Sequence, residues 1–317
     1  MSEPSLGDFH VDAALTDVSI GYFQSLGASK RVATSVFPIV PSAKQNGKYY
    51  IYDKSELLRT VAQKRAPNTE SAVRTYTLSQ DSFHCEVYSI AVDVSEQDRA
   101  NAPSQIDLEE GAARITVDDI TLRQELDFAA TVLSTGVWAT ESATTAAFSS
   151  TGLFAKIATG HKSVQQNTGI RANTLVLSAD GWFDGLMNNP DIIARLPDNE
   201  AKMVTEDFVA KIFGVDNVYI MDSVQTTSPE GSTADTYGYV GGNKAALLYV
   251  PANPGPRTPS AGYTFAWSGL IGSGGDGIRT KRMEMPWKDA MPRVETDAAY
   301  DFKVTGTDLG YLWADLV

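Results

Sequence analysis

The sequence predicts an α+β fold built around one very long helix. Apolar residues recur at spacings of three, four and seven between Leu108 and Leu133, as they do on one face of a helix. The strand-like runs are short and interleave with helices without the regular alternation of a parallel α/β protein. Residues 47–79 are strand-prone at both ends but polar throughout, with no long apolar run with which to bury themselves. These features favour a compact body with an extended β excursion.

The N-terminal part predicts an extended arm. Residues 1–36 carry scattered apolar positions without a sustained period, so we expect at most one short helix there. Such a segment cannot bury enough surface to fold alone and must lie on another surface. Pro38 and Pro41 then impose an extended path, because proline fixes φ and lacks the amide hydrogen.

The excursion itself is predicted to run out and back. Asn46-Gly47 indicates a turn, and the aromatic run at 49–52 indicates a strand. Residues 55–65 fit either a short helix or a loop, which Ala66-Pro67-Asn68 interrupts. Residues 73–94 fit one long strand or two, with apolar side chains on both alternating faces. The part from Lys54 to Glu70 is then a polar, mobile tip.

The long helix is predicted from Ser104, a suitable N-cap, to a stop at Gly136. At 1.5 Å per residue such a helix would be about 45 Å long. Its acidic pairs, Glu109-Glu110 and Asp118-Asp119, are interpreted as a solvated face or as ion pairs with a neighbouring chain. We do not interpret them as general acid/base catalysts, because such catalysis would need two carboxylates within hydrogen-bonding reach of one substrate.

The remaining elements are shorter. We expect a loop with a short helix at 139–169, a buried strand at 173–178, and a helix that stops at Asn188-Asn189-Pro190. An amphipathic helix ending at Gly214, strands near 217–225 and 246–251, and two short strands hinged at Gly306 follow.

Composition excludes several functions. The formal net charge is −13 and the isoelectric point about 4.7, which argues against a free-standing nucleic-acid binder and against adsorption to an anionic membrane. The N-terminus lacks the charged and apolar regions of a signal peptide, and no apolar run is long enough to span a bilayer. We therefore expect a protein that is synthesised and folds in a cytoplasm.

No constellation for catalysis is visible, so we predict no enzyme, catalytic residue, cofactor or metal. Cys85 is the single cysteine and lies in an apolar run, as a buried structural thiol does. The 3 histidines lie far apart and are interpreted as surface or strand-face residues. The glycine-rich run at 272–277 lacks the spacing of a phosphate-binding loop. The large aromatics Trp182, Phe183, Trp267, Trp287 and Trp313 are interpreted as core and interface anchors.

Six segments, in this order, resemble one branch of a known family. They are VFPIVPSAKQNGKYYIYDK, RAPNTESAVRTYTLS, SEQDRANA, ITLRQELDFA, NTLVLSADGWFDGLMNNPDI and GTDLGYLWADLV. The sequences of these segments and their order both resemble those of the major capsid proteins of tailed bacteriophages and prophages, which have the Hong Kong 97-type fold. The resemblance covers nearly the whole chain, and it rests on the order of the segments because no single one is diagnostic.

The resemblance implies a division of the chain into five parts. They are an N-terminal arm (1–45), an E-loop with flanking strands (46–103), a peripheral domain with the spine helix (104–169), an axial domain (170–290) and C-terminal strands that return to the peripheral domain (291–317). The E-loop would reach across a neighbouring subunit. Implied subunit-interface residues are Tyr49, Tyr50, Lys54, Glu56, Lys64, Arg65, Glu70, Arg74, Glu109 and Glu110.

The implied function is structural. The chain would assemble through pentamers and hexamers into an icosahedral shell that encloses double-stranded phage DNA without sequence-specific binding. It would assemble in the bacterial host cytoplasm and reside in the virion capsid, with a portal and, optionally, a decoration protein as partners. Many relatives begin with a scaffolding segment that is cleaved off. This chain begins close to the arm, which implies a separate scaffolding protein or a processed chain.

Several alternatives are weighed against this interpretation. An encapsulin-like nanocompartment shell protein has the same fold, so fold alone does not distinguish it from a phage capsid protein. The sequences of the six segments favour the viral branch. A tail-tube protein would lack the long helix, and decoration proteins are usually smaller. Covalent crosslinking is not expected, because Lys54 and Lys64 lie in the excursion but no partner asparagine can be matched. We also hypothesise that the acidic charge keeps the inner wall from binding DNA tightly.

Overall fold

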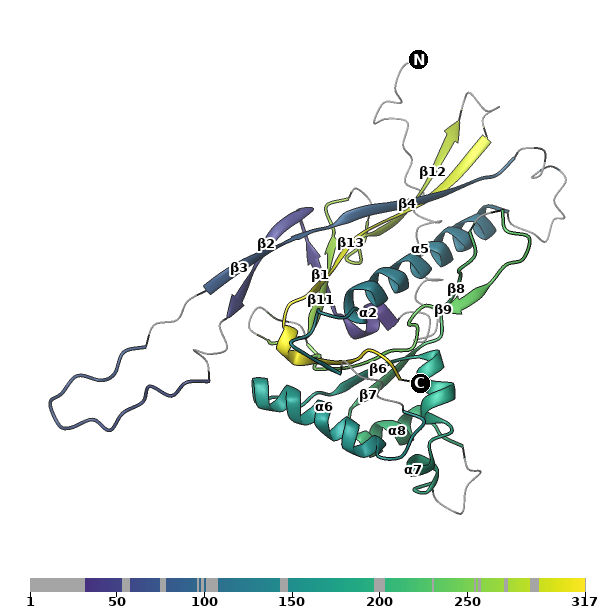
Figure 1. The fold of residues 1–317 in the computed structure, drawn as a ribbon. Helices are drawn as coiled ribbons and strands as arrows, with labels where there is room; N and C mark the ends of the chain where they lie inside the picture. The colour runs from purple at the N-terminus through teal and green to yellow at the C-terminus, as the bar shows by residue number, and fades with distance from the viewer. Residues whose placement is uncertain are drawn as a thin grey trace.

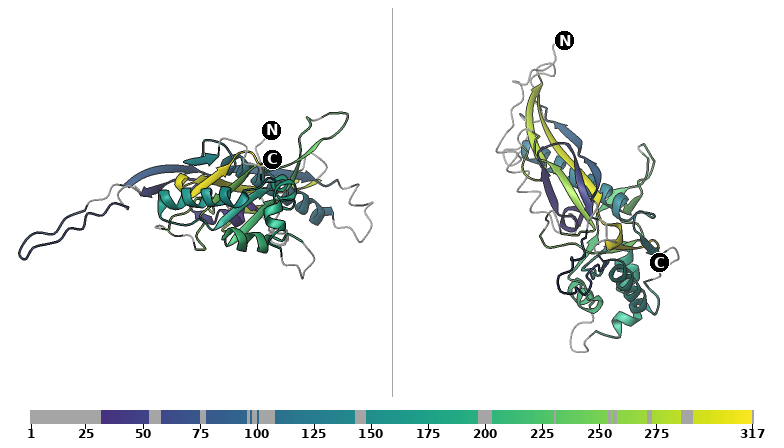
Figure 2. Two further views of the ribbon diagram at one scale, coloured as in Figure 1. Left: turned by 60° about the horizontal axis from the view of Figure 1, so that its bottom comes forward. Right: turned by 90° about the vertical axis from the view of Figure 1, so that its left-hand side faces the viewer.

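The computed structural model describes residues 32–52, 58–74, 78–95, 108–142, 148–196, 203–229, 231–253, 258–270, 273–285 and 291–316, together with residues 97, 100 and 255. The body has two sheets with helices packed against them, and a long hairpin extends from one side (Figure 1). The left-hand view of Figure 2 shows this hairpin standing well clear of the body.

The long sheet is organised around one strand. β13 (Met291–Val304) pairs antiparallel with β12 over 291–298, with β4 over 293–300 and with β11 over 300–304. β1 extends the sheet by pairing parallel with β11. The other members are β1 (Ile39–Ser42), β4 (Glu86–Asp93), β11 (Gly262–Trp267) and β12 (Ile278–Met285).

The long helix is α5 (Leu108–Val132), which lies along the long sheet (Figure 1). Its buried face includes Val117, Ile120 and Phe128, which share a core with Tyr300 and other β13 residues. The predicted start at Ser104 lies outside the described residues. The helix ends at Val132, before Gly136 adopts a positive φ of 83°.

A short helix, α2 (Val32–Val36), is fastened to α5. The amide of Ala33 donates to the buried Oε1 of Glu125 at 2.9 Å. Phe37 follows the helix and meets the ring of Phe128 edge-on, with centroids 5.2 Å apart. The short helix predicted within residues 1–36 is therefore present at the end of that segment, while residues 1–31 lie outside the described residues.

The central sheet has the order β5-β14-β10-β6-β7 and is buried on both faces. Val176, Ala246 and Leu248 face the core shared with α5, whereas their neighbours Leu175 and Leu247 face a second core beneath α6 and α8. The strands are β5 (Thr140–Ser142), β6 (Thr174–Ser178), β7 (Asn217–Met221), β10 (Ala245–Leu248) and β14 (Gly310–Trp313). The helices of this half are α6 (Leu153–Thr168), the π-helix η3 (Gly181–Leu186), α7 (Pro190–Ile193) and α8 (Glu206–Phe213), and a 3-10 turn, η5 (Thr307–Leu309), precedes β14.

Helix ends in this half follow the predicted signals. Asn189 caps α7 by accepting from the amide of Asp191, and Pro190 occupies the first turn. Thr205 caps α8, and Gly214 closes it in the left-handed region with φ 68°. The predicted stop at Asn188-Asn189-Pro190 and the predicted helix end at Gly214 are both confirmed.

Two separate hairpins complete the fold. The larger joins β2 (Asn46–Tyr52) to β3 (Leu78–His84), and the smaller joins β8 (Val224–Thr226) to β9 (Tyr237–Tyr239). The choice left open for residues 73–94 is resolved as two strands, β3 and β4, which Cys85 separates. Residues 58–74 form neither helix nor strand, which favours the loop interpretation of this part of the excursion.

The turn predicted at Asn46-Gly47 is wrong, because both residues lie within β2, paired with His84 and Phe83. Glycine is needed there for a different reason. A Cβ on Gly47 would stand 2.7 Å from the ring of Phe83, so only glycine lets the ring pack against the backbone.

Two further expectations need correction. The helix in 139–169 is not short: α6 has 16 residues, and Gly160 brings it against the ring of Trp313. Of the two short strands expected at the C-terminus, the first is long: β13 has 14 residues and forms the middle of the long sheet, while β14 pairs with β10 and β5 in the central sheet. Residues 170–290 likewise contribute to both sheets, because β11 and β12 belong to the long one.

Candidate assembly interface

The base of the β2–β3 hairpin is packed against the body by aromatic rings. Phe83 stacks on Phe265 of β11 with centroids 4.2 Å apart and planes 4° from parallel. Tyr49 stacks on the same ring at 5.7 Å. Cys85 is fully buried in this cluster, and burial raises the pKa of its thiol to about 11. The prediction of a buried, structural thiol is confirmed, since a protonated and inaccessible sulfur is a poor nucleophile.

Hydrogen bonds fix the direction in which the hairpin leaves the body. The amide of Cys85 donates to the Gln45 carbonyl at 2.8 Å, and the Gln45 side chain donates back to the Cys85 carbonyl at 3.0 Å. The amide of His84 donates to Oδ2 of Asp301 on β13 at 2.9 Å. Burial raises the pKa of Asp301, although this hydrogen bond works in the opposite direction. The base is thus part of the folded body.

The hydrogen bonds of the hairpin tip, residues 58–74, join tip residues to one another in the described structure. Thr69 Oγ1 donates to the Ala66 carbonyl at 2.8 Å, and Asn68 between them takes a positive φ of 66°. Arg65 donates to the Thr69 carbonyl, and Arg74 reaches the Arg59 carbonyl at 3.3 Å. Every side chain of the tip except that of Val61 is exposed. The tip contributes almost no buried surface to this chain.

The structure brings some of the predicted interface residues together and separates others. Lys64, Arg65, Glu70 and Arg74 lie on the exposed tip, and Tyr50 on β2 is 61 % exposed. Tyr49 lies in the base and donates to Oδ2 of Asp81 at 2.9 Å. Lys54 and Glu56 lie outside the described residues.

Glu109 and Glu110 lie on α5 rather than near the tip. A Glu109 carboxylate oxygen lies 3.3 Å from Nε of Arg282 on β12, and Glu110 pairs with Arg114 one turn further along the helix. Both acids therefore have partners within this chain, which places them apart from the exposed tip residues.

A buried ion cluster holds β4, and with it the hairpin, to the long sheet. Asp297 of β13 is 1 % exposed and accepts from Ser89 of β4 at 2.5 Å and from Arg279 of β12 at 2.7 Å, and Lys281 of β12 lies 3.2 Å away. Burial by itself would raise the pKa of Asp297, but the hydrogen bonds and the two cations hold it below its usual value. One carboxylate thus ties three strands together.

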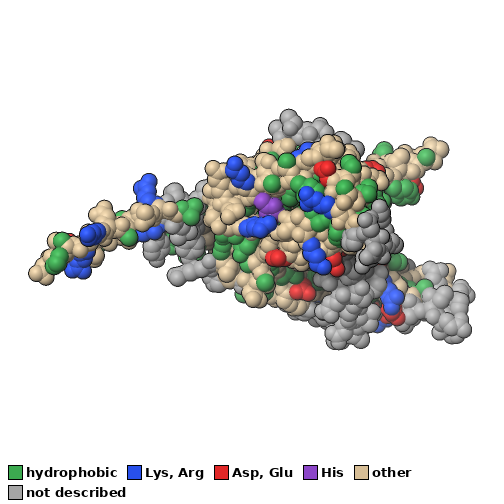
Figure 3. Space-filling view, turned by 90° about the horizontal axis from the view of Figure 1, so that it is seen from below, with side chains coloured by type: hydrophobic (Ala, Val, Ile, Leu, Met, Phe, Trp, Pro, Cys, Tyr) green, Lys and Arg blue, Asp and Glu red, His purple; other side chains and the backbone are tan. Residues whose placement is uncertain are grey.

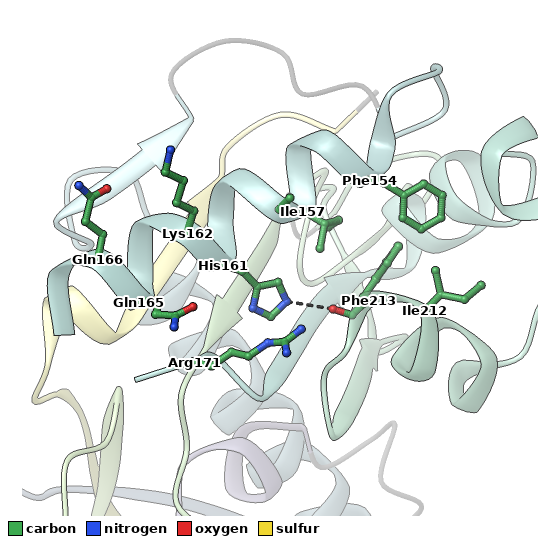
Figure 4. Close-up of a pocket in the computed structure, with 10 residues that line it drawn as sticks. Phe154, Ile157, His161, Lys162, Gln165, Gln166, Arg171, Ile212 and Phe213 are labelled. Carbon is green, nitrogen blue, oxygen red and sulfur yellow. Dashed lines mark hydrogen bonds between the residues drawn. The ribbon is translucent and has the colours of Figure 1, made fainter. Parts of the chain in front are cut away.

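A cavity of about 630 Å³ lies between α6 and α8 and carries no catalytic arrangement (Figure 4). His161 points into this region from α6, with Nε2 3.1 Å from the Phe213 carbonyl. Burial, with the charge of Arg171, lowers its pKa, so the ring is neutral and Nε2 carries the donated hydrogen. The expectation of a surface or strand-face histidine is wrong for His161, which is a buried helix residue.

Other chemical features are scarce in the part of the chain that the structure describes. No three His, Cys, Asp or Glu side chains gather there closely enough to hold a metal ion. No described helix combines the length and the apolar character needed to cross a bilayer. Of the predicted aromatic anchors, Trp182 and Trp313 are buried and Phe183 is 48 % exposed, while Trp287 lies outside the described residues.

Comparison with known proteins gives a curated relative and several solved structures of the same fold. No family model matches the chain. The major capsid protein of Burkholderia phage BcepMu is 25 % identical over 278 residues, which cover 82 % of this chain and 84 % of that protein. A phage-related protein from Bordetella bronchiseptica RB50 superposes with a TM-score of 0.71 at 20 % identity, covering 97 % of each chain.

The chain is similar in sequence to a phage major capsid protein and has the Hong Kong 97-type capsid fold. The capsid of Myoviridae phage XM1 shares the fold, with a TM-score of 0.52 at 14 % identity over 88 % of this chain and 90 % of that one. An encapsulin from Synechococcus elongatus PCC 7942 shares it as well, with a TM-score of 0.53 at 10 % identity over 90 % and 87 %. Similarity to a phage major capsid protein and to capsid structures supports a structural, shell-forming role for this chain.

Sequence reasoning missed one feature of this capsid-fold chain. The β8–β9 hairpin exposes Val224, Tyr237 and Tyr239, although its segment is rich in Gly, Ser and Thr. The sequence signal for this hairpin was the pair of tyrosines on either side of Gly238, because residues two apart lie on the same face of a strand.

Proposed function

We propose that this protein is the major capsid protein of a tailed phage or prophage. It assembles through hexamers and pentamers into an icosahedral shell around double-stranded DNA, without reading its sequence and without acting as an enzyme. The observation that carries the proposal is the β2–β3 hairpin in a chain of this fold and homology. The hairpin is anchored at its base by Phe83 and Phe265, yet no other described part of the chain covers its 58–74 tip.

The proposal assigns roles to the parts of the fold. The β2–β3 hairpin is the E-loop, which lies on a neighbouring subunit, and α5 is the spine helix of a peripheral domain formed with the long sheet. The central sheet with α6, η3, α7 and α8 is the axial domain, which faces the symmetry axes. We also propose that residues 1–31 form an arm along adjacent subunits. The interface residues of the E-loop are Tyr49, Tyr50, Lys54, Glu56, Lys64, Arg65, Glu70 and Arg74, with Glu109 and Glu110 as secondary contacts.

Physical reasoning supports this assignment. A closed shell repeats heterologous contacts that must tolerate small changes between five-fold and six-fold environments. An exposed loop on a rigid base meets this need, because it adds contact area without transmitting its adjustments into the core. Each contact can be weak, since a subunit in a shell makes many at once.

Partners and location follow from the same proposal. Assembly takes place in the host cytoplasm with a separate scaffolding protein and a portal, optionally with a decoration protein, and the product is the virion capsid. An encapsulin-like shell is the alternative, because an encapsulin shares the fold. The phage origin of the curated homologue favours a phage capsid over an encapsulin-like shell.

Negative-stain electron microscopy combined with size-exclusion light scattering tests the proposal. The purified protein, alone and with the scaffolding protein of its operon, is expected to give angular closed shells or rings of five and six subunits. Nuclease-resistant DNA inside particles from the producing host supports the viral reading, whereas a co-purifying cargo enzyme supports the encapsulin alternative. A stable monomer or dimer with and without scaffolding protein contradicts both.

A further inference from the structure

Two elements project from opposite ends of the molecule. The tip of the β2–β3 hairpin extends from one end, and the β8–β9 hairpin stands out at the other, in both Figure 1 and the left-hand view of Figure 2. Subunits arranged head to tail in a ring bring unlike ends together. The chemistry of the two projections therefore bears on which surfaces meet.

The β8–β9 hairpin presents an unpartnered apolar face. Val224 pairs with Tyr239, and Thr226 pairs with Tyr237. Because side chains directly opposite in an antiparallel ladder lie on one face, and so do residues two apart in a strand, all four side chains share a face. Val224 is 47 %, Tyr237 68 % and Tyr239 37 % exposed. A two-stranded ribbon is marginal alone in water, so such a face calls for a covering surface.

The two projections carry opposite charge. The tip has four cations (Arg59, Lys64, Arg65 and Arg74) against Glu70, a net of +3 in a chain whose net charge is −13. Residues 222–243 contain Asp222, Glu230 and Asp235 and neither Lys nor Arg, a net of −3. Figure 3 shows Lys and Arg side chains along the projecting loop of the β2–β3 hairpin.

The tip also offers apolar surface that the described residues of its own chain leave exposed. Leu58 is 60 % and Val73 83 % exposed. Arginine side chains stack on tyrosine faces, so one surface can match both the charge and the rings of the other. Many surfaces of this acidic chain would attract a basic loop, but the β8–β9 hairpin joins negative charge to an exposed aromatic face.

We propose that the 58–74 tip of one subunit binds the Val224/Tyr237/Tyr239 face of the β8–β9 hairpin of a second copy. The inference rests on the proposed function, since it names the partner surface of the E-loop. The contact is heterologous: each copy donates its tip to one neighbour and its hairpin to another. Its ionic part weakens with salt, because exposed charges are screened over about 8 Å at physiological ionic strength.

Charge exchange between the two elements tests the contact. A tip variant (Lys64→Glu with Arg65→Glu) and a hairpin variant (Asp222→Lys with Asp235→Lys) are each expected to lower particle yield on the order of tenfold at low salt. The chain carrying all four substitutions is expected to recover at least half of the unaltered yield. Asp276→Lys, on an exposed loop outside the hairpin, serves as the matched control that does not rescue the tip variant.

Thiol crosslinking gives an independent readout, because Cys85 is buried and the chain has no other cysteine. Particles carrying both Arg65→Cys and Tyr237→Cys are expected to give a ladder of crosslinked chains with a short bifunctional thiol reagent. Arg65→Cys combined with Thr159→Cys on α6 is the control that gives none. Circular dichroism verifies that each variant is folded.

The outcomes separate this inference from the proposed function. Failure of the unaltered chain to form shells under any condition counts against the function. Normal shells from the unaltered chain, with no rescue by charge exchange and no ladder, overturn the contact alone. Rescue by Asp276→Lys also overturns it, because the tip would then respond to net charge and not to the hairpin.

Discussion

At the base of the β2–β3 hairpin Phe83 is 8 % exposed, while at its tip Val73 is 83 % exposed. Both belong to one continuous excursion of the chain. The base contributes to the stability of the monomer, because its rings and its backbone hydrogen bonds join β11 and β13. The tip contributes nothing comparable and is available to another molecule. If the tip mediates assembly as proposed, stability and assembly are separable along a single hairpin, and substitutions can test that separation.

The largest effect is expected at the aromatic base. Phe83→Ala removes a stacked, buried ring and is expected to lower the free energy of unfolding by about 3 kcal/mol. Urea denaturation of the unassembled protein measures the change. Val73→Ala on the tip is the control, with an expected change below about 0.5 kcal/mol. Equal losses in the two variants would refute the separation.

A second large effect is expected at the ion cluster that holds β4. Asp297→Asn preserves the shape of the side chain but leaves Arg279 and Lys281 without its charge, and it is expected to cost about 3 kcal/mol. Asp276→Asn, on an exposed loop, is expected to be neutral. Urea midpoints that coincide for both variants would show that the cluster does not stabilise the sheet.

The same carboxylate predicts a pH dependence. The pKa of Asp297 is lower in the folded chain than in the unfolded chain, so its contribution is present above the unfolded value of about 3.9. That contribution is lost as the pH falls through the folded pKa. Thermal unfolding followed from pH 6 down to pH 3 should therefore show a smaller acid loss in Asp297→Asn than in the unaltered chain. Parallel curves would contradict this.

A smaller effect separates two adjacent tyrosines. Burial, helped by Asp81, raises the pKa of Tyr49 well above its usual range, so its hydroxyl remains a donor. Tyr49→Phe keeps the ring on Phe265 but removes that hydrogen bond, and about 0.5 kcal/mol is expected to be lost because the bond is exposed to solvent. Tyr50→Phe should be silent in the same chemical denaturation experiment. A larger loss of unfolding free energy in Tyr50→Phe than in Tyr49→Phe would mean that the other face of β2 packs against the body.

The smallest effect on stability is expected at the hairpin tip, the segment that we propose mediates assembly. Replacing residues 58–74 with a short Gly-Ser linker should change the free energy of unfolding by less than about 0.5 kcal/mol. Shell formation, followed by light scattering and electron microscopy, should be lost. If cooperative unfolding of the monomer disappeared instead, the tip would belong to the folding core and the proposed E-loop role would fail.

Several parts of this structure were predictable because their signals are local. The spacing of apolar residues from Leu108 onward predicts α5, and Thr205 and Gly214 bound α8 as caps do. Cys85, embedded in an apolar run, is buried as predicted. The exposed tip followed from the absence of any apolar run around Ala66-Pro67-Asn68. In each case the information lies within a few residues of the feature.

Other features depend on partners distant in sequence. Asn46-Gly47 has the composition of a turn, but the ring of Phe83 makes it part of a strand. Because residues 139–169 are rich in polar residues, the sequence did not predict the length of α6. The buried face of this helix packs at Gly160 against the distant ring of Trp313. The sequence predicted that Lys64, Arg65, Glu70 and Arg74 lie on an exposed excursion, as they do, but it gave no reason to expect the aromatic face of the β8–β9 hairpin.

By itself the sequence determined the order of the elements, the long helix, the exposed excursion and the lack of a catalytic motif. Only the tertiary structure decided that β13 and β14 join different sheets, that Asp297 ties three strands, and that the hairpin is packed against the body at one end and exposed at the other. The physical reason is range. Periodicity and caps act over a few residues, whereas strand pairing, ring stacking and burial of a charge are set by whichever distant segment the folded chain brings alongside.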